Sequence, residues 1–131
     1  MTYENFTIKA QDAILKAQQI ATGLSQQVIE PLHLAKAIIE TDEKLVEFIF
    51  SKMGANTRKI SHELETAIRS LPTVKSDVAG GKQYLSNDSN QILIHAKNLM
   101  SEMGDEYISL EIMLLALFKV NDQTTKIYKS N

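Results

Sequence analysis

The feature that most constrains the fold is an internal duplication. Residues 28–39 align with residues 107–118, and the residue classes follow in the same order in both segments. Each segment has a β-branched or aromatic lead-in, then a helix-start position, then an apolar run. A chain that repeats a unit in this way is predicted to fold as two related halves. Only two positions in these segments are identical: Ile29 with Ile108, and Ala37 with Ala116.

Both segments predict a short, mostly buried helix, and each helix has a start signal. The first copy begins at Glu30-Pro31 and the second at Ser109. Proline suits the first helical position because its φ is fixed and it has no N–H to leave unpaired. Serine suits the cap because its hydroxyl accepts a hydrogen bond from one of the first exposed N–H groups.

The helix preceding the first copy is predicted from Thr7, a good N-cap residue. Gly23 is predicted to end this helix in a left-handed conformation. Its apolar residues recur at steps of three and four, which predicts one buried stripe: Phe6, Ala10, Ala13, Ile14, Ala17, Ala21 and Leu24.

Two more helices complete the first half. One is capped at Asp42 and stopped by Gly54, and the other is capped by Asn56 and terminated by Pro72. The helical pattern then disappears, so residues 73–83 are predicted to be an exposed linker. The apolar residues of these two helices are Leu45, Val46, Ile49, Phe50, Met53, Ile60, Leu64, Ala67, Ile68 and Leu71.

The second half begins at Leu85-Ser86, which aligns with Phe6-Thr7 in the same register that aligns residue 107 with residue 28. Gly104 follows its first helix, and Asp122 is predicted to open a last helix over Gln123–Lys129. That first helix is expected to place these residues in the core: Ile92, Leu93, Ala96, Leu99, Met100 and Met103.

The predicted fold class is therefore all-α, a double bundle of two pseudo-symmetric tandem repeats. Repeat 1 spans residues 1–72, the linker 73–83, and repeat 2 residues 84–131. The second repeat has no counterpart to the fourth helix of the first. We therefore expect this chain to be a fragment of a longer protein.

Composition narrows the function classes. A net charge of −2 gives no electrostatic reason to expect a nucleic-acid or anionic membrane partner. The absence of cysteine excludes disulfides and thiolate metal sites. No apolar run in the sequence approaches the length that a membrane-spanning helix needs, and the first residues lack the basic start of a signal peptide. The expectation is a soluble cytoplasmic protein.

Six motifs, in order, give the chain a family resemblance. They are Phe6-Thr7 with Lys9-Ala10-Gln11, Ala13-Ile14 and Ala17-Gln18; Ile29-Glu30-Pro31-Leu32-His33-Leu34; Leu71-Pro72-Thr73-Val74; Gly104-Asp105; Ile108-Ser109; and Glu111. With these residues the chain resembles the N-terminal domain of the Clp/heat-shock AAA+ unfoldases, most closely the ClpB disaggregase type. The resemblance covers essentially the whole chain.

The resemblance implies a substrate-recognition module ahead of two ATPase rings that thread aggregated chains through a pore. Its implied partners are unfolded or aggregated proteins, the rest of the AAA+ hexamer and, indirectly, an Hsp70-type chaperone system. ATP and Mg²⁺ would belong to the absent AAA+ modules, since Gly80-Gly81-Lys82 lacks the spaced glycine of a phosphate loop. No catalytic arrangement is present, so the chain alone is not expected to be an enzyme, and the isolated domain is expected to be monomeric.

The expected binding surface is a groove between the two repeats. By resemblance it involves Thr7, Asp105 and Glu111 as a polar cluster, with Leu93 and Ile112 nearby. Structural roles explain the same residues: Thr7 as a helix cap, Asp105 as a turn residue, and Glu111 as a first-turn acid. For Leu93 and Ile112, core packing is the favoured interpretation.

One departure from the family pattern bears on the ligand. Relatives of the ClpC type have a glutamate in both repeats at the position of Glu111, a pair suited to a guanidinium group such as phosphoarginine. Here the first-repeat counterpart is Leu32. We therefore expect no phosphoarginine binding, and expect Leu32 to favour an apolar ligand segment.

Two other functions remain as alternatives. Adaptor docking, as in the protease-associated ClpA and ClpC types, is a second kind of interaction module. An enzymatic activity is the other, and hydrolysis assays with esters, peptides and nucleotides would test it. Metal binding is not expected, because it needs converging ligands and His33, His62 and His95 lie on three different predicted helices. His33 falls in the buried run and is predicted to be a hydrogen-bonded, semi-buried imidazole rather than a metal ligand.

Overall fold

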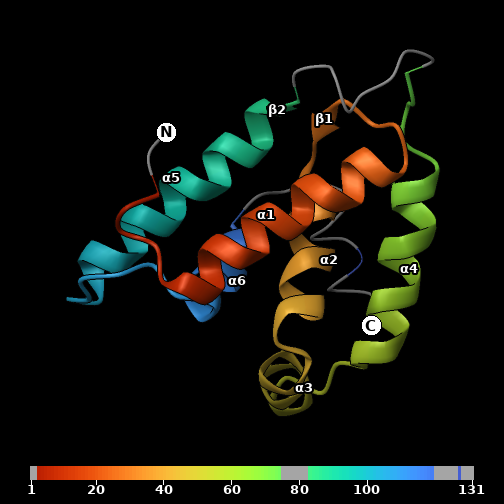
Figure 1. Ribbon diagram of the computed structural model, residues 1–131. Helices are drawn as coiled ribbons and strands as arrows, with labels where there is room; N and C mark the ends of the chain where they lie inside the picture. The colour runs from red at the N-terminus through yellow and green to blue at the C-terminus, as the bar shows by residue number, and fades with distance from the viewer. Residues whose placement is uncertain (1–2, 75–82, 120–126, 128–131) are drawn as a thin grey trace.

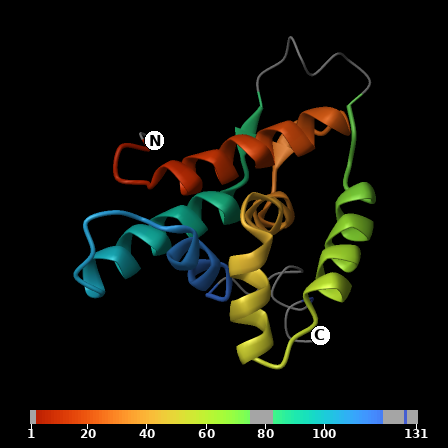
Figure 2. The ribbon, with the colours of Figure 1, turned by 60° about the horizontal axis from the view of Figure 1, so that its bottom comes forward.

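The structure is a computed structural model, and it describes residues 3–74, 83–119 and 127. Helix α2 lies in the middle of the molecule, with α4 and α5 on opposite sides of it (Figures 1 and 2). The predicted helix at Gln123–Lys129 lies outside the described residues except for Ile127, which is buried. The elements in chain order are α1 (Ile8–Gly23), β1 (Val28–Ile29), α2 (Pro31–Thr41), α3 (Glu43–Lys52), α4 (Thr57–Arg69), β2 (Tyr84–Leu85), α5 (Asn87–Glu102) and α6 (Leu110–Leu117).

The predicted helix starts are confirmed by their hydrogen bonds. At the starts of α1, α3, α4, α5 and α6 a side-chain oxygen accepts from a backbone N–H three residues later, which satisfies a donor that has no partner inside the helix. Pro31 occupies the first position of α2, as predicted. The caps are Thr7 on Ala10 (3.1 Å), Asp42 on Leu45 (3.3 Å), Asn56 on Lys59 (3.1 Å), Ser86 on Ser89 (3.0 Å) and Ser109 on Ile112 (3.3 Å).

One hydrophobic core runs through both halves. Helix α2 contacts α1, α3 and α4 of the first half and also α5 and α6 of the second. The buried stripe of α1 is built mainly from alanine, whose small side chain lets neighbouring helix backbones approach closely. These residues are fully buried: Ala10, Ala13, Ala17 and Ala21.

The repeat spacing reappears in the geometry of the described residues. The same offset in residue number separates the starts of α1 and α5, the ends of α1 and α5, and the starts of α2 and α6. The left-handed residues also match, because Ser25 (φ 56°) and Gly104 (φ 73°) occupy equivalent positions after α1 and α5.

Short parallel strand pairs join the two halves, and the sequence did not predict them. Strand β1 pairs with β2, with Val28 opposite Tyr84 and Ile29 opposite Leu85. An isolated bridge pairs Phe6 with Ile108. Two-residue strands are too short to show the alternating pattern on which strand prediction depends. The fold is therefore mostly helical rather than purely α.

Three local predictions are wrong. Gly23 is the last residue of α1 and is not left-handed; the chain turns two residues later, at Ser25. Met53 and Met103, expected in the core, are 56% and 55% exposed. Each methionine directly precedes a left-handed glycine, beyond the last buried turn of its helix.

Gly104 and Gly23 provide a matched stability test, because Gly104 is left-handed and Gly23 is helical. Gly104→Ala should destabilise the domain by roughly 1–2 kcal/mol, because a β-carbon disfavours the left-handed conformation. Gly23→Ala should be neutral or stabilising by up to about 1 kcal/mol, since alanine favours a helix and, beyond its own helix backbone and chain neighbours, no atom lies within 4 Å of the added Cβ. Urea unfolding of both variants measures this, and equal effects would contradict it.

Candidate functional site

The two halves meet at the Phe6–Ile108 bridge, and their line of contact is here called the seam. The Thr7 N–H donates to the Ile108 carbonyl at 2.9 Å, and the Ile108 N–H donates to the Asn5 carbonyl at 2.7 Å. These bonds hold the segment before α1 against the loop before α6. Two hollows adjoin this bridge: Phe6 and Ile108 line the first, and the residues that follow them, Thr7 and Ser109, line the second.

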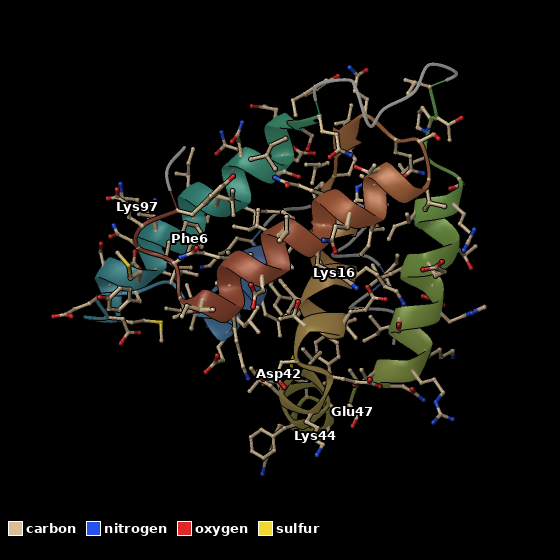
Figure 3. All side chains as sticks on the ribbon, viewed as in Figure 1. Phe6, Lys16, Asp42, Lys44, Glu47 and Lys97 are labelled. Atoms are coloured by element: carbon tan, nitrogen blue, oxygen red, sulfur yellow. The ribbon has the colours of Figure 1, made fainter. Side chains whose placement is uncertain are left out.

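The first hollow, here named the Leu93 groove, has a volume of about 440 Å³. Its apolar residues Phe6, Leu93 and Ile108 are buried, whereas Ile94 is 44% exposed. Figure 3 shows Phe6 beside α5, with Lys97 on the same helix. The lining residues are Glu4, Asn5, Phe6, Leu93, Ile94, Lys97, Asn98 and Ile108.

The second hollow, here named the Lys9 groove, has a volume of about 360 Å³ and lies where the first turns of α1, α3 and α6 meet. Ile8 is 79% exposed at this groove. The positive ends of three helix dipoles meet here, which favours acidic side chains such as Asp42 and Glu111. The lining residues are Thr7, Ile8, Lys9, Asp42, Leu45, Ser109, Leu110 and Glu111.

An ion pair crosses the Lys9 groove. The Lys9 Nζ donates to Asp42 Oδ2 at 2.7 Å, while Asp42 Oδ1 caps α3. The hydrogen bond from Lys9, and then that from the Leu45 N–H, lower the pKa of Asp42. The same bond to Asp42 raises the pKa of Lys9, with a smaller upward effect from Glu111. Because the pair is exposed, it contributes little to stability and chiefly sets the local charge.

The structure distributes the predicted binding residues over several places. Thr7 and Glu111 line the Lys9 groove, and Leu93 lines the Leu93 groove. Asp105 is exposed in the loop after α5 and lines neither of these grooves. Ile112 is 2% exposed and Leu93 is 1% exposed, which confirms the favoured interpretation that both pack in the core.

The expectation for Leu32 is wrong. Its side chain is only 3% exposed and lines none of the hollows described here, whereas Glu111 at the equivalent position of α6 is exposed and lines the Lys9 groove. The two positions therefore differ in burial as well as in charge.

Several residues of the Lys9 groove were not predicted from the sequence. Ile8 is an apolar residue off the buried stripe of α1, which is the one local signal for a surface role. Asp42 and Leu45 were assigned only to the cap and core of α3. Nothing local indicates that Lys9 meets Asp42, 33 residues away.

His33 is hydrogen-bonded, as predicted, and it is fully buried rather than semi-buried. The Glu30 N–H donates to Nδ1 at 2.9 Å, so Nε2 carries the proton and donates to Gln26 Oε1 at 2.7 Å. The Gln26 amide then donates to the Ile68 carbonyl at 2.7 Å. Burial lowers the pKa of His33 to about 4. This buried chain ties the loop after α1 to α2 and to the end of α4.

A hollow away from the Phe6–Ile108 bridge is polar rather than apolar. A third hollow, of about 430 Å³ between α2, α3 and α4, is lined mostly by charged and polar side chains, among them Glu40, Glu43, Glu47 and Arg58.

Across the described ranges, no three acidic or histidine side chains come together as a metal site requires. None of the described helices combines the length and apolar character needed to span a bilayer.

Thr7→Ala tests the structural role of a predicted binding residue. Loss of the cap on Ala10 should destabilise the domain by about 1 kcal/mol. Thr7→Ser retains the hydroxyl and should recover most of that loss. Chemical unfolding measures both variants, and any binding defect of Thr7→Ala has to be compared with this loss. A Thr7→Ala variant as stable as the wild type would contradict the cap.

Comparison with known proteins identifies the family. The family model described as the Clp repeat (R) N-terminal domain matches residues 5–131. The chain belongs to the Clp N-terminal domain family. This confirms the predicted resemblance.

The most similar curated relatives of this Clp N-terminal domain include two bacterial chaperones. The "Chaperone protein ClpB" of Bacteroides thetaiotaomicron is 40% identical over 98% of this chain. The "Chaperone protein ClpB" of Porphyromonas gingivalis is 37% identical over 98% of this chain. In both cases the Clp domain spans about 14% of the relative's length.

A solved structure shows the same fold. The Hsp104 N-terminal domain from Candida albicans matches with a TM-score of 0.84, covering 97% of this chain and 81% of that one. At 22% sequence identity this likeness supports the fold of the Clp domain alone.

Proposed function

We propose that this chain is the substrate-recognition N-terminal domain of a ClpB-type disaggregase. In this role it binds exposed apolar segments of unfolded or aggregated proteins and passes them to the AAA+ ring. The family match supports this proposal, as do the relatives that carry the ClpB name.

The observation that carries the proposal is the position of the two grooves next to the Phe6–Ile108 bridge. The two grooves adjoin along the chain, because a residue that lines the Leu93 groove is directly followed by one that lines the Lys9 groove at Phe6–Thr7 and again at Ile108–Ser109. One extended segment lying over the bridge would contact both grooves. It would meet exposed Ile94 at one groove and exposed Ile8 at the other.

The predicted residues take different roles in this arrangement. Thr7 and Glu111 contact the bound segment from the Lys9 groove, and Leu93 forms part of the floor of the Leu93 groove. Ile112 supports the start of α6 from the core. Asp105 acts as a more distant acidic neighbour rather than as part of either groove.

Binding in such shallow grooves should be weak and exchangeable. A small buried area gains little beyond the entropy lost when a disordered segment becomes ordered. Weak capture suits a domain that transfers its ligand onward. We propose that ATP and Mg²⁺ act only in the rest of the parent protein, within a hexamer that works with an Hsp70-type system.

Adaptor docking, the function of the ClpA and ClpC types, is the second candidate. The same grooves could hold an adaptor surface. The ClpB names of the most similar relatives favour client binding over this alternative.

An NMR titration of this chain with a permanently unfolded polypeptide tests the proposal. Amide shifts are expected for residues 4–9, 93–98 and 108–111, which line the two grooves. The polar hollow between α2, α3 and α4 serves as the internal control, with Arg58 and Ser61 expected to remain unshifted. Shifts scattered over the surface, or none at saturating ligand, would overturn the proposed function.

A further inference from the structure

The Lys9 groove has two carboxylates but only one ammonium group. Lys9 pairs with Asp42 at 2.7 Å, whereas Glu111 takes part in none of the three ion pairs found within the described residues. Glu111 nevertheless lines the same groove. The residues that line the groove therefore sum to one net negative charge, and Glu111 is the carboxylate among them without a salt-bridge partner in the described part of the chain.

The remaining lining of this groove is largely apolar. Ile8 is 79% exposed, Leu45 is half-buried, and Leu110 is buried beneath them. An apolar surface next to one uncompensated carboxylate complements an apolar side chain that lies beside a cation. The Leu93 groove differs, because Glu4 and Lys97 give it one charge of each sign.

We propose that the Lys9 groove selects apolar segments flanked by a basic residue, with Lys9 as the residue that sets the strength of this preference. The inference rests on the proposed function and specifies its ligand. The basic side chain of the bound segment pairs with Glu111, while its apolar neighbour lies on Ile8 and Leu45. Lys9 limits the attraction because it neutralises Asp42 and places a positive charge close to the incoming cation.

The proposal predicts opposite effects for two substitutions in one groove. Lys9→Gln removes the ammonium and leaves Asp42 and Glu111 both unpaired, so the preference for a basic flank should increase. Glu111→Gln removes the uncompensated charge, so the preference should disappear. Asp42 still caps α3 in both variants, since its Oδ1 accepts from the Leu45 N–H and not from Lys9.

The test uses two peptides that share one apolar core and differ only in flanking residues, lysine in one and glutamate in the other. The wild-type chain should bind the lysine-flanked peptide roughly two- to fivefold more tightly, the effect expected for one exposed ion pair. The ratio of the two affinities, lysine-flanked over glutamate-flanked, should rise by a similar factor in Lys9→Gln and fall to about one in Glu111→Gln. Raising the salt from about 0.05 to 0.5 M should reduce the ratio, because exposed charges are screened.

Lys16→Gln is the matched control. Lys16 is an exposed lysine on α1, about two helical turns or ~10 Å along the helix from Lys9, and it does not line the Lys9 groove. Figure 3 labels Lys16 on α1 and Asp42 at the start of α3. This variant changes the net charge of the chain by the same amount as Lys9→Gln and should leave the binding ratio unchanged.

The outcomes separate this inference from the proposed function. If both peptides bind the wild type equally, with amide shifts at the grooves, the charge preference is overturned and the proposed function stands. If Lys16→Gln changes the ratio as much as Lys9→Gln does, only net charge matters and the inference fails. If neither peptide binds, both proposals are overturned.

Discussion

Phe50→Ala is expected to destabilise the domain by about 3–5 kcal/mol, the usual loss when a buried phenylalanine is truncated. Phe50 is 1% exposed, and only it and Val46 are buried on α3. The substitution therefore leaves a cavity at the main anchor of this helix. Against a typical stability of about 5–15 kcal/mol, the loss is a large fraction. Urea unfolding should show a lower midpoint with an unchanged slope.

Phe48→Ala is the control on the same helix. Phe48 is 61% exposed, and its ring lies 5.3 Å from the Lys52 ammonium. An exposed cation–π contact contributes about 0.5–1 kcal/mol, so the control should lose no more than that. If Phe50→Ala lost as little as Phe48→Ala, the packing of α3 described above would be wrong.

The Phe50 substitution should also affect the Lys9 groove. Helix α3 supplies Asp42 and Leu45 to this groove. If α3 packs less tightly, the Lys9–Asp42 ion pair weakens, although no residue of the groove itself is substituted. Amide signals at the start of α1 should shift in Phe50→Ala and remain in place in Phe48→Ala.

Acidification is expected to destabilise the domain by about 3 kcal/mol between pH 6.5 and pH 4 through His33 alone. In the folded protein burial lowers the pKa of His33 to about 4. The unfolded chain, with an ordinary histidine pKa of about 6.5, takes up a proton in this interval while the folded chain does not. Stability from this group is therefore fully present above pH 6.5 and is lost as the pH falls to 4.

The position of Nδ1 acts in the same direction as burial. This atom accepts a hydrogen bond from the Glu30 N–H at 2.9 Å, so protonation would bring two donors together in a buried site. Carboxylates also titrate in acid, which makes the comparison with His33→Gln necessary. Urea unfolding at several pH values between 7.5 and 4.5 should give a shallower pH dependence for that variant.

His62→Gln controls for the loss of an imidazole, since His62 lies on α4, outside the buried chain. If the wild type and His33→Gln lost stability in parallel as the pH fell, protonation of His33 would not be the cause.

Local sequence signals predicted much of the fold. The caps at Thr7, Asn56 and Ser109 were found because each depends only on residues within one helical turn. The burial of Leu93 and Ile112 followed from the spacing of apolar residues along single helices. Gly23 was placed wrongly because its type suits a left-handed turn, yet the chain makes that turn at Ser25.

The candidate site was less accessible to sequence reasoning. Thr7 and Glu111 were grouped only through the family resemblance, and the structure places them in one groove. Asp105, grouped with them for the same reason, does not line either groove.

The sequence by itself determined where helices begin, which faces are apolar and that the second half of the chain repeats the first. The tertiary structure alone decided that Phe6 pairs with Ile108, that Lys9 reaches Asp42, and that His33 donates to Gln26 in the core. Caps and stripes arise from interactions within a few residues, so they can be predicted from the chain. Contacts between distant segments depend on how the helices pack around α2, because that packing fixes which helix starts meet at the seam.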